Sequence, residues 1–233
     1  MDQDSWLPGR LADAAASLLL GAVCPGCERP SARLCLACRA ELDALVAETV
    51  DVRGSTVPVA AAGRHEGLLR ALVIAYKERQ AWWLRDVLGA LLAEAVARAL
   101  LDTGGGREVV LVPVPSLPAS VRARGLDVTR ALAVTAARRL SASGLPARVE
   151  SGLRHARTVD DQAELGESAR WRNLSGALVA KPGRPGLRVV VDDLTTTGAS
   201  LAEACRALAA ASLSASACAV IAATPRRDGR RAG

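Results

Sequence analysis

The chain has 233 residues, of which 50% are apolar and 2% aromatic, so it can bury one good core plus a small appendage. Its net charge is +6, but the tail 226–233 holds four arginines and one aspartate, which leaves little excess charge for a broad nucleic-acid surface. No segment reaches the roughly 20 apolar residues that cross a bilayer, and we expect a cytoplasmic protein with no membrane partner.

The pattern of apolar residues predicts alternating strands and helices over most of the chain. Helices are expected at Leu11–Leu20 and Cys35–Val50, on either side of a cysteine-rich loop, and Arg53-Gly54-Ser55 is expected as a turn. Because strands and helices then alternate, we expect an α/β fold with a mainly parallel central sheet and helices on both faces. The expected strands are Val57–Ala62, Val109–Val114, Ala147–Glu150, Ala177–Ala180, Leu187–Val191 and Ala217–Ala223, and the expected helices are Gly67–Ala75, Trp82–Leu101, Asp127–Leu140 and Leu201–Ala211.

Four of the six cysteines form two C-x-x-C pairs, the first in the loop between the first two helices and the second at the start of the second helix. Two such pairs can place four thiolates tetrahedrally around Zn²⁺, whereas disulfides are disfavoured in a cytosolic chain. Since sulfur fills all four positions, the predicted zinc site is structural. Cys205 and Cys218 have no such spacing and are expected to be small core residues. The predicted zinc ligands are Cys24, Cys27, Cys35 and Cys38.

The segment Leu187–Ser200 carries the strongest functional signal. An apolar strand ends in Asp192 and Asp193, and a loop of hydroxyl residues around one glycine then opens a helix. A helix N-terminus and hydroxyls suit a phosphate, and the carboxylates suit ribose hydroxyls or Mg²⁺. An acid pair can also be the solvated end of a strand. It can also belong to the magnesium-binding strand of a P-loop NTPase, but the chain has no P-loop motif. The predicted phosphate cradle consists of Thr195, Thr196, Thr197, Gly198, Ala199 and Ser200.

This segment resembles the signature with which type I phosphoribosyltransferases bind phosphoribosyl pyrophosphate (PRPP). Together with the cysteine pairs, it makes the chain similar to the ComF/GntX family of competence-protein-F-like phosphoribosyltransferase homologues, from about Cys24 to Thr224. The resemblance implies a type I phosphoribosyltransferase-like fold. It divides the chain into a helix and zinc module over 1–52, a phosphoribosyltransferase-like domain over 53–225 and a basic tail over 226–233.

Three further motifs support the resemblance. Ala75-Tyr76-Lys77 is similar to an aromatic-lysine motif that implies Lys77 as the pyrophosphate cation, although no glycine follows it. Leu111–Gly125 is similar to the V-P-V-P and R-x-R-G stretch, which implies that Arg122 and Arg124 reach an anionic substrate, but the usual aromatic and Asn-Gln are replaced after Gly125. A hood over the site is implied for Arg157, Thr158, Gln162, Arg170 and Asn173.

The resemblance implies that Asp192, Asp193 and Lys77 are the catalytic residues and that Mg²⁺ and Zn²⁺ are the cofactors. The implied enzyme is a pentosyltransferase of nucleotide metabolism. Two alternatives remain open: a non-catalytic sensor of PRPP or a nucleoside monophosphate, and a competence-type DNA-uptake factor acting on single-stranded DNA. With five aromatic residues in the chain, stacking on DNA bases has little support. Neither His65 nor His155 is assigned a catalytic role, and a homo-oligomer is left open.

Overall fold

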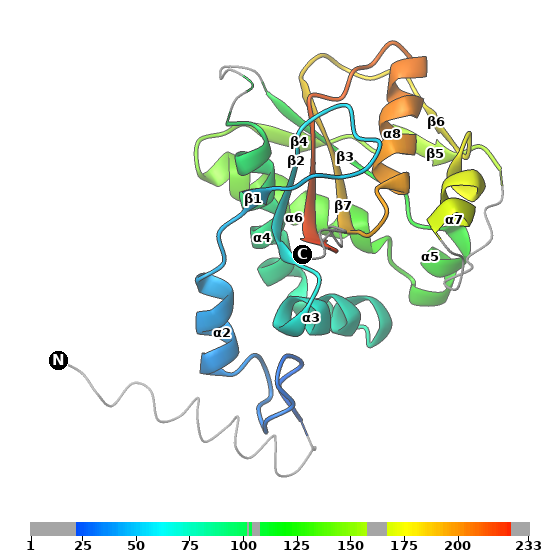
Figure 1. Cartoon of the computed structure of the whole chain (residues 1–233). Helices are drawn as coiled ribbons and strands as arrows, with labels where there is room; N and C mark the ends of the chain where they lie inside the picture. Colours follow the sequence, from blue (N-terminus) through cyan, green and yellow to red (C-terminus); the bar gives the residue numbers. More distant parts are fainter. Residues whose placement is uncertain (1–21, 102, 104–107, 158–166, 225–233) are drawn as a thin grey trace, which may run out of the picture.

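The computed structural model describes residues 22–101, 103, 108–157 and 167–224 (Figure 1). The helix expected at Leu11–Leu20 and the basic tail lie outside these residues. Within them, no helix has the length and apolar character needed to cross a membrane. The boundary expected at residue 53 stays a prediction.

A six-stranded sheet in the order β1-β2-β8-β7-β3-β4 forms the centre of the molecule. Every neighbouring pair is parallel except β1 with β2, which is antiparallel. The α/β class and the mainly parallel sheet are therefore confirmed. The strands are β1 (Glu48–Thr49), β2 (Val59–Arg64), β3 (Val109–Pro113), β4 (Ala147–Val149), β7 (Leu187–Thr195) and β8 (Ala217–Ala223).

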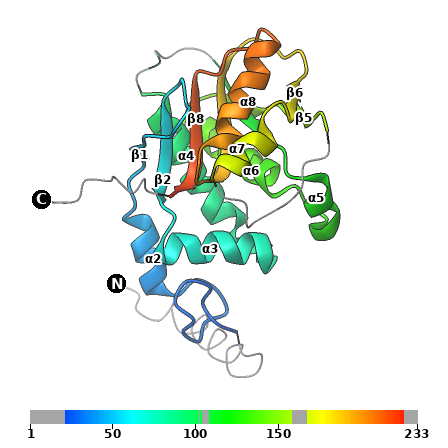
Figure 2. The ribbon, with the colours of Figure 1, turned by 45° about the vertical axis from the view of Figure 1, so that its right-hand side comes forward.

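Helices cover both faces of this sheet. The sheet separates the core into two clusters, one on each face. Figures 1 and 2 show α8 on one side and α4 with α6 on the other. A second, antiparallel sheet of two strands, β5 and β6, packs on the α8 side. The helices are α2 (Leu36–Asp43), α3 (Gly67–Glu78), α4 (Arg85–Ala99), α5 (Pro118–Arg124), α6 (Val128–Ala142), α7 (Glu167–Leu174) and α8 (Ala199–Ala210), and the two short strands are β5 (Leu153–His155) and β6 (Leu178–Ala180).

The core is built from small and medium aliphatic side chains, which allows close packing. The strand β3 is buried along its whole length, as expected for a continuous apolar strand inside a parallel sheet. Helices α4 and α6 approach closely at Gly89, where a Cβ atom would lie 2.6 Å from Cβ of Thr135. A side chain at this position would therefore push the two helices apart.

The structure departs from the expected elements in several places. The helix expected to reach Val50 ends at Asp43, because Glu48 and Thr49 pair with β2 instead, and sheet pairing overrides helix propensity there. The expected helix from Trp82 starts with a 3₁₀ turn over Trp82–Leu84. Besides β1, three further elements were not expected: α5, β5 and α7.

Candidate functional site

Asp192 and Asp193 lie inside β7 rather than after its end, which corrects the predicted strand boundary at Val191. Pairing of β7 with β3 stops at Val191 opposite Pro113, whereas pairing with β8 continues to Thr195. The N–H of Val114, just after β3, still donates to the Val191 carbonyl at 2.9 Å. The two aspartates therefore extend past the carboxyl end of β3, at the edge of a parallel sheet where ligands commonly bind.

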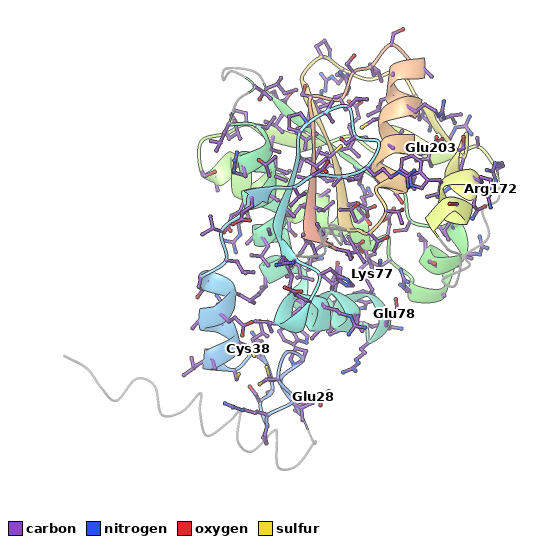
Figure 3. The ribbon with its side chains drawn as sticks, viewed as in Figure 1. Glu28, Cys38, Lys77, Glu78, Arg172 and Glu203 are labelled. Carbon is purple, nitrogen blue, oxygen red and sulfur yellow. The ribbon has the colours of Figure 1, made fainter. Side chains whose placement is uncertain are left out.

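Asp193 forms an ion pair with Lys77 of α3. Val189 and Val191 face the cluster that includes α3, α4 and α6, and the strand's alternation brings Asp193 to the same side. Its Oδ2 atom lies 2.9 Å from Nζ of Lys77, with 6% of the aspartate side chain and 27% of the lysine side chain exposed. Figure 3 shows Lys77 between α3 and the end of the sheet. Structure thus brings together two of the predicted catalytic residues.

The charges of this cluster influence one another. Burial alone would lower the pKa of Lys77, but Asp193 and Asp192 more than offset it, so the pKa is raised and the lysine stays charged. For Asp192, burial and the negative charge of Asp193 raise the pKa well above its usual value, despite Lys77. Oδ1 of Asp192 also accepts the N–H of Asp193 at 2.8 Å. Asp193 is paired with the lysine, whereas the charged form of Asp192 is disfavoured by its burial and by its neighbour.

The residues between Thr195, which ends β7, and Ala199, which starts α8, form a loop that we call the hydroxyl loop. This agrees with the predicted order of strand, loop and helix. Gly198 occupies the N-cap of α8 with φ 80°, a left-handed conformation that favours glycine. A Cβ atom there would lie 2.7 Å from the Arg53 carbonyl oxygen, so the backbone before the Gly54 turn sits directly against the loop. The N–H of Ala199 donates to Oγ1 of Thr197 at 3.4 Å. Thr195 is buried, while Thr196 is exposed.

A cavity of about 1080 Å³ opens beside this loop. Its walls come from the segment around β1, from the ends of β2 and β8, and from Thr195–Thr197. Its lining carries charges of both signs, from Arg53 and Arg64 and from Glu48 and Asp51, and Arg64 pairs with Glu66 at 3.3 Å. Its lining includes the hydroxyl loop but not the two aspartates or Lys77, so the loop lies between the cavity and the charged cluster.

The two candidate arginines of α5 differ in their surroundings. Arg124 has 19% of its side chain exposed, lies 3.5 Å from Glu78 Oε1, and is close enough to Lys77 to oppose its charge. Arg122 is exposed. Asp127, which replaces an expected amide residue, caps α6 by accepting the N–H of Arg130 at 3.1 Å, and it also accepts a hydrogen bond from Ser116. Only Arg124 therefore adjoins the charged cluster.

Part of the predicted hood over the site lies within the residues that the structure describes. Arg157, at the end of β5, donates to the carbonyl oxygens of Asn173 at 2.6 Å and Ser175 at 3.2 Å, and so ties β5 to α7. Trp171 of α7 would contact any side chain placed at Gly54, so α7 approaches the turn that borders the hydroxyl loop. Of the other predicted hood residues, Thr158, Gln162 and the side chain of Arg170 lie outside the described residues.

Three residues near the site were not predicted to belong to it. Tyr76 is 1% exposed, packs edge-on against Trp82 with ring centroids 5.4 Å apart, and its hydroxyl has no partner among the described residues. Burial raises its pKa to about 12. His65 follows β2, and burial and Arg70 lower its pKa, against the pull of Asp193. His155 places Nε2 3.2 Å from the Pro115 carbonyl. Of the three, only Tyr76 could have been identified from the sequence, because it directly precedes Lys77.

The four predicted metal ligands come together in one cluster. Their sulfur atoms all lie within 4.8 Å of one another and can hold a metal ion. Burial opposes ionisation of Cys24, but the backbone N–H groups of Cys35, Cys27 and Gly26 lower its pKa to about 6. Burial and the neighbouring thiols raise the pKa of Cys38. Figure 3 places Cys38 at the base of α2, beside the cysteine loop.

The cysteine loop docks on α3, the helix that carries Lys77. Gly26 lies so close to Leu68 of α3 that an added Cβ would overlap the leucine side chain, and it would lie 3.0 Å from Sγ of Cys38. Figures 1 and 2 show the loop below α3, away from the sheet. The metal-type cluster and the charged cluster thus share one supporting helix.

Comparison with known proteins found no match to this chain, either among protein-family models or among curated proteins.

Proposed function

We propose that the chain is a type I phosphoribosyltransferase-like protein, similar to the ComF/GntX family, which binds PRPP and transfers its phosphoribosyl group to a nitrogen nucleophile. The observation that carries the proposal is the continuous run of strand, two aspartates, hydroxyl loop and helix, with Asp193 paired to Lys77 at the carboxyl edge of a parallel sheet. The residues that we propose for the ribose, the phosphate and the pyrophosphate all come from one short segment and one facing helix.

In this proposal the 5′-phosphate binds at the start of α8. The helix N-terminus offers backbone N–H groups and the positive end of its dipole, and Thr196, Thr197 and Ser200 add hydroxyls. Gly198 lets the backbone turn sharply into the helix with φ 80°.

Asp192 and Asp193 would bind the ribose hydroxyls, and they are also the residues that would hold Mg²⁺. The residues fit the ion, because two adjacent carboxyl groups offer the oxygen ligands that Mg²⁺ prefers. When bound, Mg²⁺ neutralises charge on pyrophosphate oxygens. Lys77 holds Asp193 in place and, with Arg124, presents positive charge toward the leaving group.

The proposed reaction breaks the bond between the anomeric carbon of the ribose and the pyrophosphate oxygen and forms a bond from that carbon to the acceptor nitrogen. Pyrophosphate leaves with the electron pair of the broken bond. The side chains of this site orient the sugar and stabilise charge, without forming a covalent intermediate.

The four-cysteine cluster is proposed to bind Zn²⁺ in a structural role. Four sulfur ligands match the tetrahedral preference of zinc and leave no position for a catalytic water. The ion would fix the loop that packs on Leu68 of α3.

Calorimetric titration with PRPP and Mg²⁺ tests the ligand, on the wild type and on Asp192→Asn and Asp193→Asn. We expect binding by the wild type and weaker binding by both variants. Release of pyrophosphate is then measured with a panel of nucleobases as acceptors. A wild-type protein that fails to bind PRPP would contradict the proposal.

A PRPP or nucleotide sensor is the second candidate, and the pairing of Lys77 with Asp193 favours it. A lysine already neutralised by a carboxylate has less charge to offer a leaving group. Binding of PRPP without pyrophosphate release under any acceptor would support this sensor. A role in handling single-stranded DNA has less support, because the chain has only five aromatic residues for stacking on bases and Tyr76 is buried.

A further inference from the structure

Two cysteines outside the four-sulfur cluster lie side by side. Cys205 belongs to α8 and Cys218 to β8, and their Sγ atoms are 3.6 Å apart. They are 13 residues apart in the chain, so only the packing of α8 on β8 brings them together. Neither contributes to the four-cysteine cluster near α3.

The two thiols differ in accessibility. Cys218 has no exposed surface, whereas Cys205 is half-buried. Cys205 is therefore the more accessible of the two residues, while Cys218 meets only its neighbour and the surrounding apolar core. This is the arrangement of an attacking thiol with a buried thiol behind it.

We propose that Cys205 and Cys218 form an oxidisable dithiol, which a peroxide or a small-molecule disulfide converts into a disulfide joining α8 to β8. The sulfurs need to approach by about 1.5 Å to reach the bonded distance of about 2.05 Å. The two sulfurs already face each other within one core cluster, so this approach is the movement that oxidation requires.

The chemistry requires a thiolate at Cys205. The hydrogen bond between the two sulfurs lowers the pKa of Cys205 and raises that of Cys218, which agrees with this assignment. With oxidised glutathione, the Cys205 sulfur breaks the S–S bond and displaces one glutathione thiolate, and the Cys218 sulfur then displaces the second glutathione, so the reagent gains two electrons. With a peroxide, the Cys205 sulfur attacks one oxygen, the O–O bond breaks, and hydroxide leaves to give a sulfenic acid. The Cys218 sulfur then attacks that sulfur, and water leaves with the Cys218 proton. The two sulfurs lose two electrons in total, and the peroxide gains them.

The disulfide would lie close to the site already described but does not depend on its function. Cys218 is opposite Val190 of β7, two residues before Asp192, and α8 begins directly after Gly198. Oxidation would therefore fasten the helix that follows the hydroxyl loop to the strand beside the aspartates.

Peptide mapping of the full chain tests the proposal. Trypsin cuts after Arg206 and so separates Cys205, in residues 189–206, from Cys218, in residues 207–226. Zinc-loaded protein is treated with oxidised glutathione, its free thiols are alkylated, and it is digested without reductant. We expect the two peptides to be joined, and to separate on reduction. Two alkylated, unlinked peptides, or Cys205 joined to a cysteine of the zinc cluster, would overturn the proposal.

Two single variants distinguish the roles of the thiols. Cys218→Ser should trap glutathione on Cys205, because the resolving sulfur is missing. Cys205→Ser should leave Cys218 free of glutathione in the folded protein, since no reagent reaches it. Glutathione found on Cys218 in the folded Cys205→Ser protein would contradict the assigned order of attack.

Discussion

Lys77 and Asp193 are joined by an ion pair of 2.9 Å between α3 and β7, with the aspartate almost fully buried. Both charges are needed for either to be tolerated there, because an unpaired buried charge is costly. The pair also fixes the end of α3 against the strand that carries the hydroxyl loop. It is therefore both a structural link and the centre of the proposed site.

Replacing Lys77 by methionine should destabilise the protein by about 3 kcal/mol, the lower end of the range for breaking a buried pair, because the lysine is partly exposed. The double variant Lys77→Met/Asp193→Asn should recover part of this loss, since the unpaired carboxylate is removed. Urea unfolding of the four proteins in the cycle gives the coupling energy, expected at about 1–3 kcal/mol. A coupling energy of zero would show that the two groups do not interact in solution.

The raised pKa of Asp192 predicts a pH-dependent stability. The folded protein keeps this proton to a higher pH than the unfolded chain, so the free energy of unfolding falls as pH rises above the unfolded carboxyl pKa of about 3.9. Asp192→Asn should remove that loss and be more stable than the wild type near neutral pH, with the difference shrinking toward acid. The asparagine Oδ1 can still accept the N–H of Asp193.

Urea unfolding at several pH values measures the Asp192 effect, and Asp193→Asn is its matched control. That control should lose stability near neutral pH, because Lys77 loses its partner. Asp192→Asn should at the same time weaken binding of PRPP with Mg²⁺. If both variants follow the wild-type pH profile, the assigned charge interactions are wrong.

Gly198 should be intolerant of a side chain for two separable reasons. Its φ of 80° costs about 1–2 kcal/mol for an alanine, and the added Cβ would also press on the Arg53 carbonyl at 2.7 Å. Gly125 has a similar φ of 69° but no atom within 4 Å of an added Cβ. Gly125→Ala should therefore show the backbone cost alone, and Gly198→Ala a larger loss in the free energy of unfolding. Equal losses would argue against the close approach of Arg53.

The sequence predicted well those features that follow from local pattern. The strand β3 is a continuous apolar run, and the strand, loop and helix around Gly198 follow from adjacent residues. The spacing of Cys24 to Cys38 likewise identified the four-sulfur cluster. In each case neighbours in the chain are also neighbours in space.

Features set by tertiary pairing were missed. The strand β7 continues through Asp192 because β8 still pairs with it, although β3 has ended at Pro113. Two contacts join separate elements, that of Lys77 with Asp193 and that of Cys205 with Cys218. Such contacts produce no periodic pattern in the sequence. Helix α2 ends early for the same reason, since the residues after it pair with β2.

The four-cysteine cluster predicts that the purified protein carries about one equivalent of zinc, measured by elemental analysis. Cys24→Ser should lose the metal, because Cys24 has no exposed surface and its sulfur accepts the N–H of Cys35, so no other residue can replace it. Cys218→Ser, which removes a thiol outside the cluster, should keep full zinc. Loss of zinc should also loosen the packing of the loop on Leu68 and raise hydrogen exchange at the start of α3. Full zinc occupancy in Cys24→Ser would exclude the four-thiolate site.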